Sequence, residues 1–273
     1  MTPDGQDARH AAWASPFLGL ASFVRKTLVI AELEARKLRH DPTELFMRAV
    51  QPTLWLLVFG QVFSRMRGLP QGRYTDFIAP GILAQSVLFI SIFYGITIIW
   101  ERDLGLIHKM LVSPTPRGAL VLGKALSAGV RSISQVVLIY VLCLITRVNL
   151  SWNPLHLLGI VFVVVLGAAC FSTFSLVIAC LVKTRERFMG IGQVLTMPLF
   201  FASNAIYPID MMPPWLKAVA RVNPLTYQVD ALRGLMLNGG QMHYSLAVDL
   251  GMLLLVTTLL VTLGARLYRN VVG

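Results

Sequence analysis

Six long apolar segments constrain the fold of this chain more than any other feature. They cover approximately residues 44–64, 75–100, 119–146, 155–182, 189–208 and 245–266. A helix needs about 20 mostly apolar residues to cross a hydrocarbon core about 30 Å thick, and each segment reaches that length. Inside lipid, a spanning segment must also satisfy its own backbone hydrogen bonds, which favours helices. We therefore predict an all-α, polytopic membrane protein with six transmembrane helices.

The composition agrees with a membrane protein. Only 14% of the residues are charged and 56% are hydrophobic, whereas soluble domains average about 25% charged and 45–50% apolar residues. The net charge is +11, but the basic residues lie between the apolar segments and form no patch interleaved with aromatic side chains. We interpret them as signals of membrane orientation and expect no nucleic-acid partner. Cys143, Cys170 and Cys180 lie inside apolar segments without metal-ligand spacing, and we expect them to serve packing.

The distribution of basic residues predicts the orientation. An even number of spans places both termini on the same side of the membrane. If the termini are inside, the inner segments hold most of the 24 Lys and Arg residues, including Lys183, Arg185 and Arg187. Inner loops of membrane proteins carry such an excess, so we predict a multi-pass protein of a bacterial plasma (inner) membrane with both termini cytoplasmic. The basic residues between positions 65 and 73 are an exception to this pattern.

The first forty residues lack the apolar core and small-residue cleavage site of a secretory signal. Instead, apolar residues recur at helical spacing at Val24, Leu28, Ala31, Ala35 and Leu38. Arg25 and Arg36 lie on the opposite side. This pattern is typical of an amphipathic helix on the inner membrane surface, although a helix packed on a soluble partner would show it too. A helix-start signal at Asp41, Pro42 and Glu44 follows. We therefore divide the chain into a cytoplasmic N-terminus, residues 1–41, and a six-span transmembrane domain, residues 42–273.

One stretch is similar to a nucleotide site. Gly118–Lys124 fits the first seven positions of the phosphate-binding loop G-x-x-x-x-G-K. That loop ends in Ser or Thr and joins a strand to a helix, whereas Ala125 has no hydroxyl and the segment continues into an apolar span. We predict that the chain has no nucleotide-binding site of its own. Because H-E-x-x-H and G-x-S-x-G are also missing from the sequence, we predict a chain that is not an enzyme, with no cofactor and no metal of its own.

Arg131 is the one ionisable residue that the pattern places well inside a span. It lies seven residues beyond Lys124, about 10 Å deeper at the rise of a helix. An ion-coupled transporter is expected to place ionisable groups at mid-membrane, but the acidic residues lie mostly in loops. We favour an arginine that snorkels to the inner interface over a gating charge.

The inner loop after the second span is unusual in its charge. The stretch "WERDLGLIHKMLVSPTPRGALVLGKAL" places Glu101, Arg102 and Asp103 directly under that span. Residues 106–111 can form a short helix that Pro114 ends. This loop is either a docking surface or an ordinary solvated connector, and the residues alone leave both open.

The outer segment before the last span is also unusual. In "YPIDMMPPWLKAVARVNPLTYQVDALRGLMLNGG", two prolines at 213 and 214 are expected to break the fifth span. Short helices are predicted over residues 215–222 and from Pro224 to about Leu237, with Asn223 as cap and Asn238 to Gly240 as terminator. Both are too short and too charged to cross the membrane. We predict interfacial or re-entrant helices on the outer face.

These two segments resemble those of the type-2 ATP-binding-cassette (ABC) export permeases. The inner loop is similar to that family's E-R-x-x-G…L…P…LGK pattern, and "NPLTYQVDALRGLMLNG" is similar to the sequence before its last span. The likeness is greatest to the daunorubicin-resistance and nodulation-factor export types, and it covers nearly the whole chain. The resemblance implies that two permeases, identical or homologous, form a twelve-span unit with a separate ABC ATPase subunit beneath each. ATP and Mg²⁺ would then bind to the ATPase subunits.

The resemblance also implies roles for particular residues. The N-terminal helix and the inner loop would contact the ATPase, the loop through Glu101, Arg102, Asp103, Leu106, His108 and Lys109. The substrate would pass between the two permeases along Gln85, Phe89, Phe93, Phe200, Phe201 and Asn204, although aromatic residues on membrane helices more often face lipid or the core.

The function implied by the resemblance is ATP-driven export of an amphipathic substrate through the lipid membrane. The substrate would be a drug-like compound, a lipid or a lipid-linked glycan. Two alternatives come from other classes: a channel or ion-coupled carrier that works without an ATPase, and a membrane-anchored assembly protein.

Overall fold

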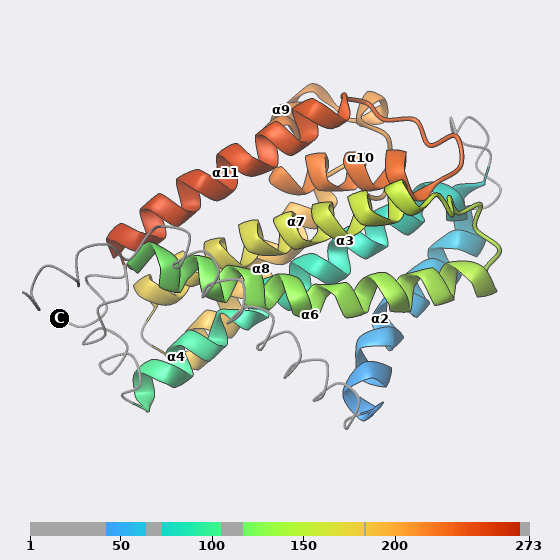
Figure 1. Cartoon of the computed structure of the whole chain (residues 1–273). Coiled ribbons are helices and arrows are strands. Elements are labelled where there is room, and N and C mark those ends of the chain that lie inside the picture. The colour runs from blue at the N-terminus through green and yellow to red at the C-terminus, as the bar shows by residue number, and fades with distance from the viewer. Residues whose placement is uncertain (1–41, 64–72, 105–116, 183, 268–273) are drawn as a thin grey trace, which may run out of the picture.

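The protein is a bundle of helices of unequal length (Figure 1). The computed structural model describes residues 42–63, 73–104, 117–182 and 184–267. In chain order the helices are α2 (Pro42–Val62), α3 (Tyr74–Tyr94), α4 (Ile96–Asp103), α6 (Arg117–Ile145), α7 (Pro154–Leu181), α8 (Arg185–Phe201), the short η3 (Ile209–Met211), α9 (Pro214–Val222), α10 (Pro224–Met236) and α11 (Leu246–Leu267). Within these ranges the only strand-like contact is an isolated bridge between Leu150 and Leu237. The prediction of an all-α protein is confirmed for this part of the chain; the predicted N-terminal interfacial helix lies outside it.

Four helices are long and apolar enough to cross a membrane. They are Tyr74–Tyr94, Ala125–Ile145, Pro154–Leu181 and Leu246–Leu267, which coincide with four of the six predicted spans. The other two predicted spans are helical but shorter in their apolar part. α2 contains the apolar stretch Val50–Gly60, and α8 has 17 residues, about 26 Å of helix against a hydrocarbon core of about 30 Å.

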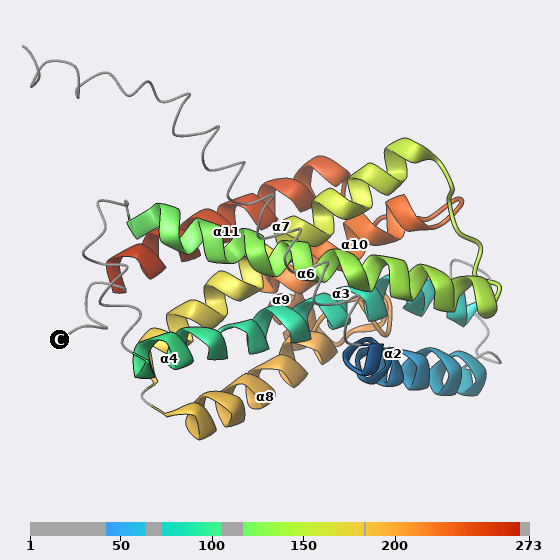
Figure 2. The ribbon, with the colours of Figure 1, turned by 60° about the horizontal axis from the view of Figure 1, so that its bottom comes forward.

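Two predicted spans differ from the structure in their ends. The segment predicted over 75–100 is divided at Gly95 into α3 and α4, which continues nearly in line with α3 (Figure 2). The segment predicted over 189–208 ends at Phe201, well before the two prolines that were expected to break it. The amide nitrogen of Asn223 donates to the carbonyl oxygens of Leu199 at 2.7 Å and Ala202 at 3.2 Å. This distant side chain satisfies carbonyls that the last turn of a helix leaves unpaired.

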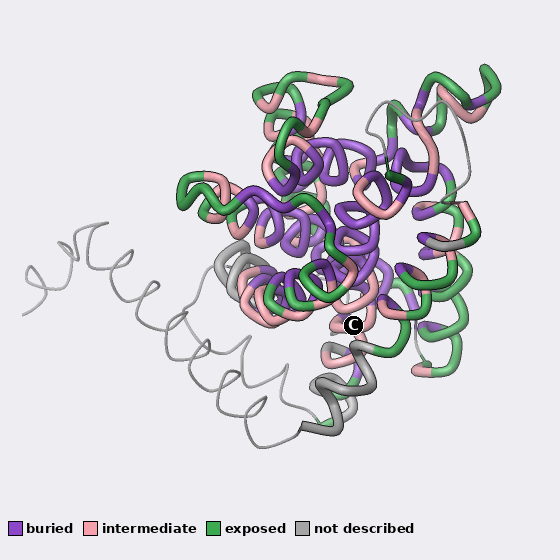
Figure 3. Tube along the Cα trace, turned by 90° about the vertical axis from the view of Figure 1, so that its right-hand side faces the viewer, coloured by how far each residue is buried: buried purple, intermediate pink, exposed green. Residues whose placement is uncertain are grey.

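The core lies along α3 and α7. In the most apolar window of α3, 78% of the residues are buried, against 17% in α11. Buried residues gather at the centre of the bundle (Figure 3), and exposed residues lie on its periphery. α3 is therefore the central helix, and α11 presents most of its apolar surface outward, as a helix that faces lipid would.

Arg73 at the start of α3 and two loops, residues 146–153 and residues 237–245, meet at one end of the bundle. We call this end the connector end. The Arg73 guanidinium donates to the Arg147 carbonyl at 3.1 Å. The Ser151 amide donates to the Met236 carbonyl at 2.8 Å, and the Asn238 amide nitrogen donates to the Leu150 carbonyl at 2.7 Å. These bonds tie the start of α3, the α6–α7 loop and the end of α10 together.

Replacing Gly81 with alanine should destabilise the protein because α3 lies against the turn after α8 at this position. A Cβ there would stand 2.6 Å from the Ala205 carbonyl oxygen and 2.8 Å from its Cα. Overpacking of this kind costs about 1–3 kcal/mol. Gly251→Ala on α11 is the control, because nothing lies within 4 Å of that position and both variants gain the same helix propensity. Thermal unfolding of the purified variants, followed by intrinsic fluorescence, measures the difference. Equal melting temperatures would contradict the close contact.

Candidate functional site

A pocket lies between α3, α4 and α6, and most of its lining is aromatic or apolar. Its volume is about 310 Å³, and it is lined by Phe89, Ile90, Phe93, Tyr94, Ile96, Thr97 and Arg131. The rings of Phe89 and Phe93 stack with centroids 6.0 Å apart. The guanidinium carbon of Arg131 lies 5.2 Å from the centre of the Tyr94 ring. We call this site the aromatic pocket; Arg131 is the only charged residue among those that line it.

The backbone at the end of α3 shapes this pocket. Gly95 separates α3 from α4, and the hydroxyl of Thr97 donates to the Tyr94 carbonyl at 2.7 Å. The hydroxyl of Ser175 on α7 donates to the carbonyl of Ile92, which is also in the last turn of α3. A Cβ at position 95 would lie 2.9 Å from the Phe188 ring and nearer still to the Ser175 hydroxyl. Glycine is therefore needed where α3, α7 and α8 meet beside the pocket.

The aromatic pocket lies far from the connector end. On α6, Arg131 is 14 residues before Ile145, about 21 Å at the rise of a helix. On α3, Phe89 is 15 residues after Tyr74, about 22 Å by the same measure. A hydrocarbon layer about 30 Å thick with its boundary at Tyr74 and Ile145 would hold the pocket in the third that is farthest from the connector end.

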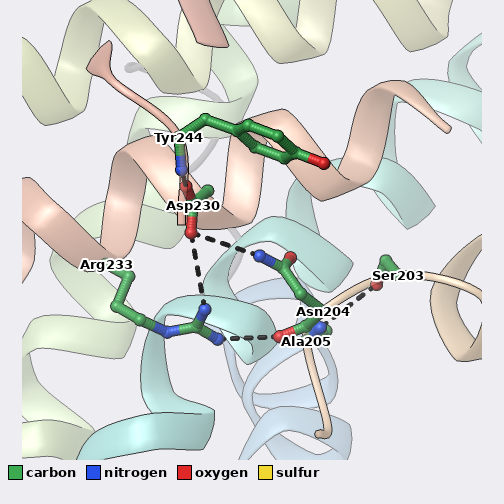
Figure 4. A network of polar contacts seen from close by, with 6 residues as sticks. All are labelled: Ser203, Asn204, Ala205, Asp230, Arg233 and Tyr244. Carbon is green, nitrogen blue, oxygen red and sulfur yellow. Dashed lines mark hydrogen bonds and ion pairs between the residues drawn. The ribbon is translucent and has the colours of Figure 1, made fainter. Parts of the chain in front are cut away.

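A second site is polar and lies at the connector end. We call Asn204, Asp230, Arg233 and Tyr244 the polar cluster (Figure 4). The Asp230 carboxylate accepts from the Asn204 side-chain amide at 3.3 Å and from the Tyr244 backbone amide at 2.7 Å. The Arg233 guanidinium lies 3.7 Å from this carboxylate and donates to the Asn204 carbonyl at 2.7 Å. One carboxylate thereby holds α10, the turn after α8 and the loop before α11.

The polar cluster is buried, which makes its pairing necessary. Asp230 is 0% exposed and Arg233 4%. The guanidinium carbon of Arg233 also lies 4.1 Å from the centre of the Phe77 ring on α3. Because a buried charge without a partner is strongly destabilising, these contacts fix α10 against α3. A cavity of about 190 Å³ adjoins the cluster.

Asp249 is a further buried acid near this cluster. It lies in the first turn of α11 and is 0% exposed. Neither of its carboxylate oxygens has a hydrogen-bond partner in the described part of the chain. The sequence showed Asp249 only as a charge near the end of an apolar segment, and nothing in the local pattern indicated burial.

The predicted substrate-path residues lie on α3, at the end of α8 and in the turn that follows α8. Phe89 and Phe93 line the aromatic pocket, whereas Asn204 belongs to the polar cluster. Phe200 is buried and Phe201 is half exposed, and both pack near Trp55 of α2. Gln85 is buried in α3 and its amide nitrogen has no partner in the described residues. Gln85, Phe89 and Phe93 recur at four-residue spacing on α3, and a common path along all six residues stays a prediction.

The predicted ATPase-coupling residues are described only in part. Glu101, Arg102 and Asp103 are the last residues of α4. Leu106, His108 and Lys109 lie outside the described residues. The backbone therefore places the acidic start of the inner loop at the end of a helix, and the rest of this prediction stays open.

The stretch that is similar to a phosphate-binding loop is helical. Gly118–Lys124 lies at the start of α6, which runs without interruption from Arg117 to Ile145. A phosphate-binding loop is an open loop between a strand and a helix. The stretch is therefore helical and leads into a candidate membrane span that begins at Ala125.

Comparisons with known proteins agree that the chain is similar to transport permeases. Residues 25–237 match the family model described as ABC-2 type transporter. The chain is similar to the daunorubicin resistance ABC transporter permease protein DrrB1 of Streptomyces coeruleorubidus, with 24% identity over 273 residues that cover 98% of this chain and 95% of the relative. It is similar to the inner membrane transport permease YadH of Escherichia coli K12, with 26% identity over 191 residues that cover 66% and 70%. It is also similar to ycf38 of Cyanophora paradoxa, named as a transport permease, with 27% identity over 265 residues that cover 91% and 89%.

Proposed function

Because the chain belongs to the ABC-2 type transporter family, we propose that it is the transmembrane permease subunit of an ATP-driven exporter. The observation that carries this proposal is the family match over residues 25–237, which includes every described helix from α2 to α10. Relatives that match most of the chain or two thirds of it are named as transport permeases. Such permeases are normally not enzymes, so the hydrolysis of ATP belongs to a separate subunit.

In this proposal the chain crosses a bacterial plasma membrane six times, with α2 and α8 as the two shorter crossings and both termini cytoplasmic. The start of α8 carries Arg185, whose guanidinium carbon lies 4.3 Å from the centre of the Trp100 ring on α4. This end of the bundle is opposite to the connector end. In the proposal it is the cytoplasmic side, where the positive-inside rule expects basic residues such as Arg185, although the connector end also carries Arg73 and Arg147. The connector end is then extracytoplasmic.

α9 and α10 suit an interfacial and a re-entrant helix on the outer face. α10 has 13 residues, about 20 Å of helix, which is too short to cross. Most of it is buried, and its two ends are bonded to the end of α8 and to the α6–α7 loop. α9 exposes Trp215 and Val222, which fits an amphipathic helix at the interface.

We further propose that an ABC ATPase subunit docks under this chain and under a second permease, either a copy or a homologue. The coupling surface would comprise Glu101, Arg102, Asp103, Leu106, His108 and Lys109. Its support is the position of α4, which continues α3 past Gly95 away from the connector end. Ile99 of α4 is buried in a cluster with Leu176 of α7 and Phe188 of α8. A displacement of α4 by the ATPase would therefore reach two other helices.

The substrate in this proposal is an amphipathic molecule. The aromatic pocket offers Phe89 and Phe93 as apolar walls. A groove of about 580 Å³ between α8 and α9 is lined mostly by apolar residues, among them Leu195, Leu199 and Val222. Surfaces of this kind suit a drug-like compound, a lipid or a lipid-linked glycan, each of which has a large apolar part.

An ion-coupled carrier is the second candidate, because one observation favours it. Asp249 is buried near one end of a candidate span, and its carboxylate has no hydrogen-bond partner in the described residues. Intramembrane acids of this kind mark proton relays in carriers. Such a carrier would work without an ATPase.

Transport by inside-out membrane vesicles tests the proposal. Vesicles that contain the chain and its ATPase subunit should accumulate a fluorescent amphipathic dye when ATP is supplied. Uptake should persist with a protonophore and stop with vanadate. If Glu101 forms a buried pair with a basic group, as this proposal supposes, Glu101→Ala should lower uptake about tenfold or more at an unchanged amount of protein, because the loss of one partner of such a pair costs about 3–5 kcal/mol. Gly251→Ala is the control for an inert substitution.

Two outcomes would count against parts of this proposal. Uptake that needs no ATP, collapses with the protonophore and is lost in Asp249→Asn would establish the ion-coupled carrier instead. Normal uptake by Glu101→Ala would make the inner loop a connector and leave the export function standing.

A further inference from the structure

We infer that the cavity beside the polar cluster binds a sugar, an uncharged group that is rich in hydroxyls. We call this site the polar cavity. Three polar residues of its lining are buried, Asn204, Asp230 and Arg233. Asp210 and His243, which also line it, are exposed, so the cavity opens to the surface. The inference does not depend on the proposed export function, because binding needs neither an ATPase nor transport.

Asn204 offers an unused acceptor. Its side-chain nitrogen donates to the Asp230 carboxylate at 3.3 Å. Chemistry requires a nitrogen at this position, because an ionised carboxylate can only accept hydrogen bonds. The other amide atom is therefore the oxygen. Asn204 is 1% exposed, and this oxygen has no hydrogen-bond partner in the described part of the chain. It can accept a hydrogen bond from a ligand.

Arg233 offers an unused donor in the lining of the same cavity. One terminal nitrogen lies 3.7 Å from the Asp230 carboxylate, and the other donates to the Asn204 carbonyl at 2.7 Å. The Nε atom is buried without a hydrogen-bond partner among the residues that the structure describes. Because a guanidinium keeps its protons in proteins, this N–H can only donate. Buried polar atoms nearly always have a partner, and these two indicate that a polar molecule binds here.

A hydroxyl-bearing molecule matches the two atoms better than an ion does. The charges of Asp230 and Arg233 are paired with each other, and both carboxylate oxygens already accept hydrogen bonds. The described contacts therefore leave one donor and one acceptor unused. A hydroxyl both donates and accepts, so the hydroxyls of one molecule can satisfy both atoms. A carboxylate has no donor for Asn204, and an ammonium has no acceptor for Arg233.

The size and position of the polar cavity suit a sugar ring. Its volume of about 190 Å³ leaves room for more than one water molecule and lies below the range of about 300–1,000 Å³ of sites for drug-sized ligands. Ile209 and Met242 add apolar walls, which suit the C–H faces of a sugar ring. The polar residues come from α10 and from the turn after α8 (Figure 4), at the connector end.

Binding of methyl glycosides to the full chain tests the inference. The protein is placed in nanodiscs of phosphatidylcholine, and saturation-transfer difference NMR is recorded with the methyl α-D-pyranosides of glucose, galactose and mannose against empty nanodiscs. At least one glycoside should give a saturable signal. Asn204→Leu should weaken its binding about tenfold or more, because the Arg233 N–H and the ligand lose a shared partner group. Asp210→Leu, at the exposed mouth, should weaken it about threefold or more.

The control is Arg221→Leu, which removes an exposed side chain that does not line the polar cavity. This variant should bind the glycoside as the wild type does. If Asn204→Leu does not yield folded protein by size-exclusion chromatography, Asp210→Leu decides. Wild-type binding by every folded variant of these two residues would overturn the inference. A saturable signal from no glycoside would also overturn it, because water alone would then fill the cavity.

Competitors identify the chemistry and the source of the ligand. Acetate or tetramethylammonium that displaces the glycoside at equal concentration would overturn the match to hydroxyls. Monoglucosyl diacylglycerol in the nanodisc that displaces the glycoside assigns the cavity to the head group of a membrane glycolipid. Displacement by soluble sugars alone assigns it to free saccharides outside the lipid. Either of these last two results supports the inference.

Discussion

Replacing Arg233 with leucine lowers the apparent melting temperature of the purified protein by roughly 6–20 °C. The substitution leaves the Asp230 carboxylate buried, at 0% exposure, without the guanidinium now 3.7 Å away. Removal of one partner from a buried charge pair costs about 3–5 kcal/mol, and each kcal/mol shifts melting by about 2–4 °C in a protein of this size class. Thermal unfolding in detergent, followed by intrinsic fluorescence, measures the shift.

Two further variants separate the charge pair from other effects of this substitution. Arg221→Leu removes an exposed arginine on α9 and should change the melting temperature little. Arg233→Leu combined with Asp230→Asn should recover part of the loss, because the removal of both charges leaves no unpaired ion in the interior. A double variant that melts lower than Arg233→Leu would show that the carboxylate does not depend on Arg233, and the assigned role of the pair would be wrong.

Asn223→Ala should destabilise the protein by about 2–4 kcal/mol, because one side chain serves two helices. Its oxygen accepts from the Leu225 amide at 3.0 Å and caps α10. Its nitrogen donates to the Leu199 carbonyl at 2.7 Å and to the Ala202 carbonyl at 3.2 Å. The substitution therefore removes the cap and also leaves two carbonyls at the end of α8 without this partner.

The chain contains a matched control for this variant. Asn153 precedes Pro154 as Asn223 precedes Pro224, and its oxygen caps α7 by accepting from the Leu155 amide at 3.0 Å. Asn153 is exposed, and the loss of such a cap costs about 1 kcal/mol. Chemical or thermal unfolding of Asn153→Ala and Asn223→Ala gives the comparison. Equal losses in the two variants would show that the bonds to α8 contribute nothing.

Features that depend on neighbouring residues could be predicted from the sequence. α7 begins at Pro154 and α10 at Pro224, each after an asparagine cap. Asn223 and Pro224 were recognised in advance because an Asn-Pro pair carries both signals in two adjacent positions. Apolar length identified the four candidate spans for the same reason, since the requirement for about 20 apolar residues applies to each segment alone.

Features that depend on distant residues could not be predicted from the sequence. The end of α8 at Phe201 is set partly by Asn223, and nothing near residue 201 shows it. The polar cluster joins Asn204 to Asp230 and Arg233, 26 and 29 residues later. In the sequence the charges of Asp230 and Arg233 only marked a helix too charged to cross the membrane, because their burial is decided by packing against α3. Phe89 and Phe93 of the aromatic pocket were among the predicted substrate-path residues, a role that stays a prediction, while the arginine of the pocket comes from another helix.

The bonds at the connector end also set an order of events during synthesis. Asn149 and Asn238 are bonded across 89 residues, and a ribosome adds about 5–20 residues per second, so about 4–18 s separate their appearance. Throughout that interval α3 and α6 exist without α10, and Phe77 lacks its contact with Arg233. α7 is complete only once Leu181 has been added. A ribosome that stalls before Pro224 therefore leaves a nascent chain whose central helix lacks the cover of α10. We expect membrane proteases that degrade incomplete proteins to recognise this exposed face.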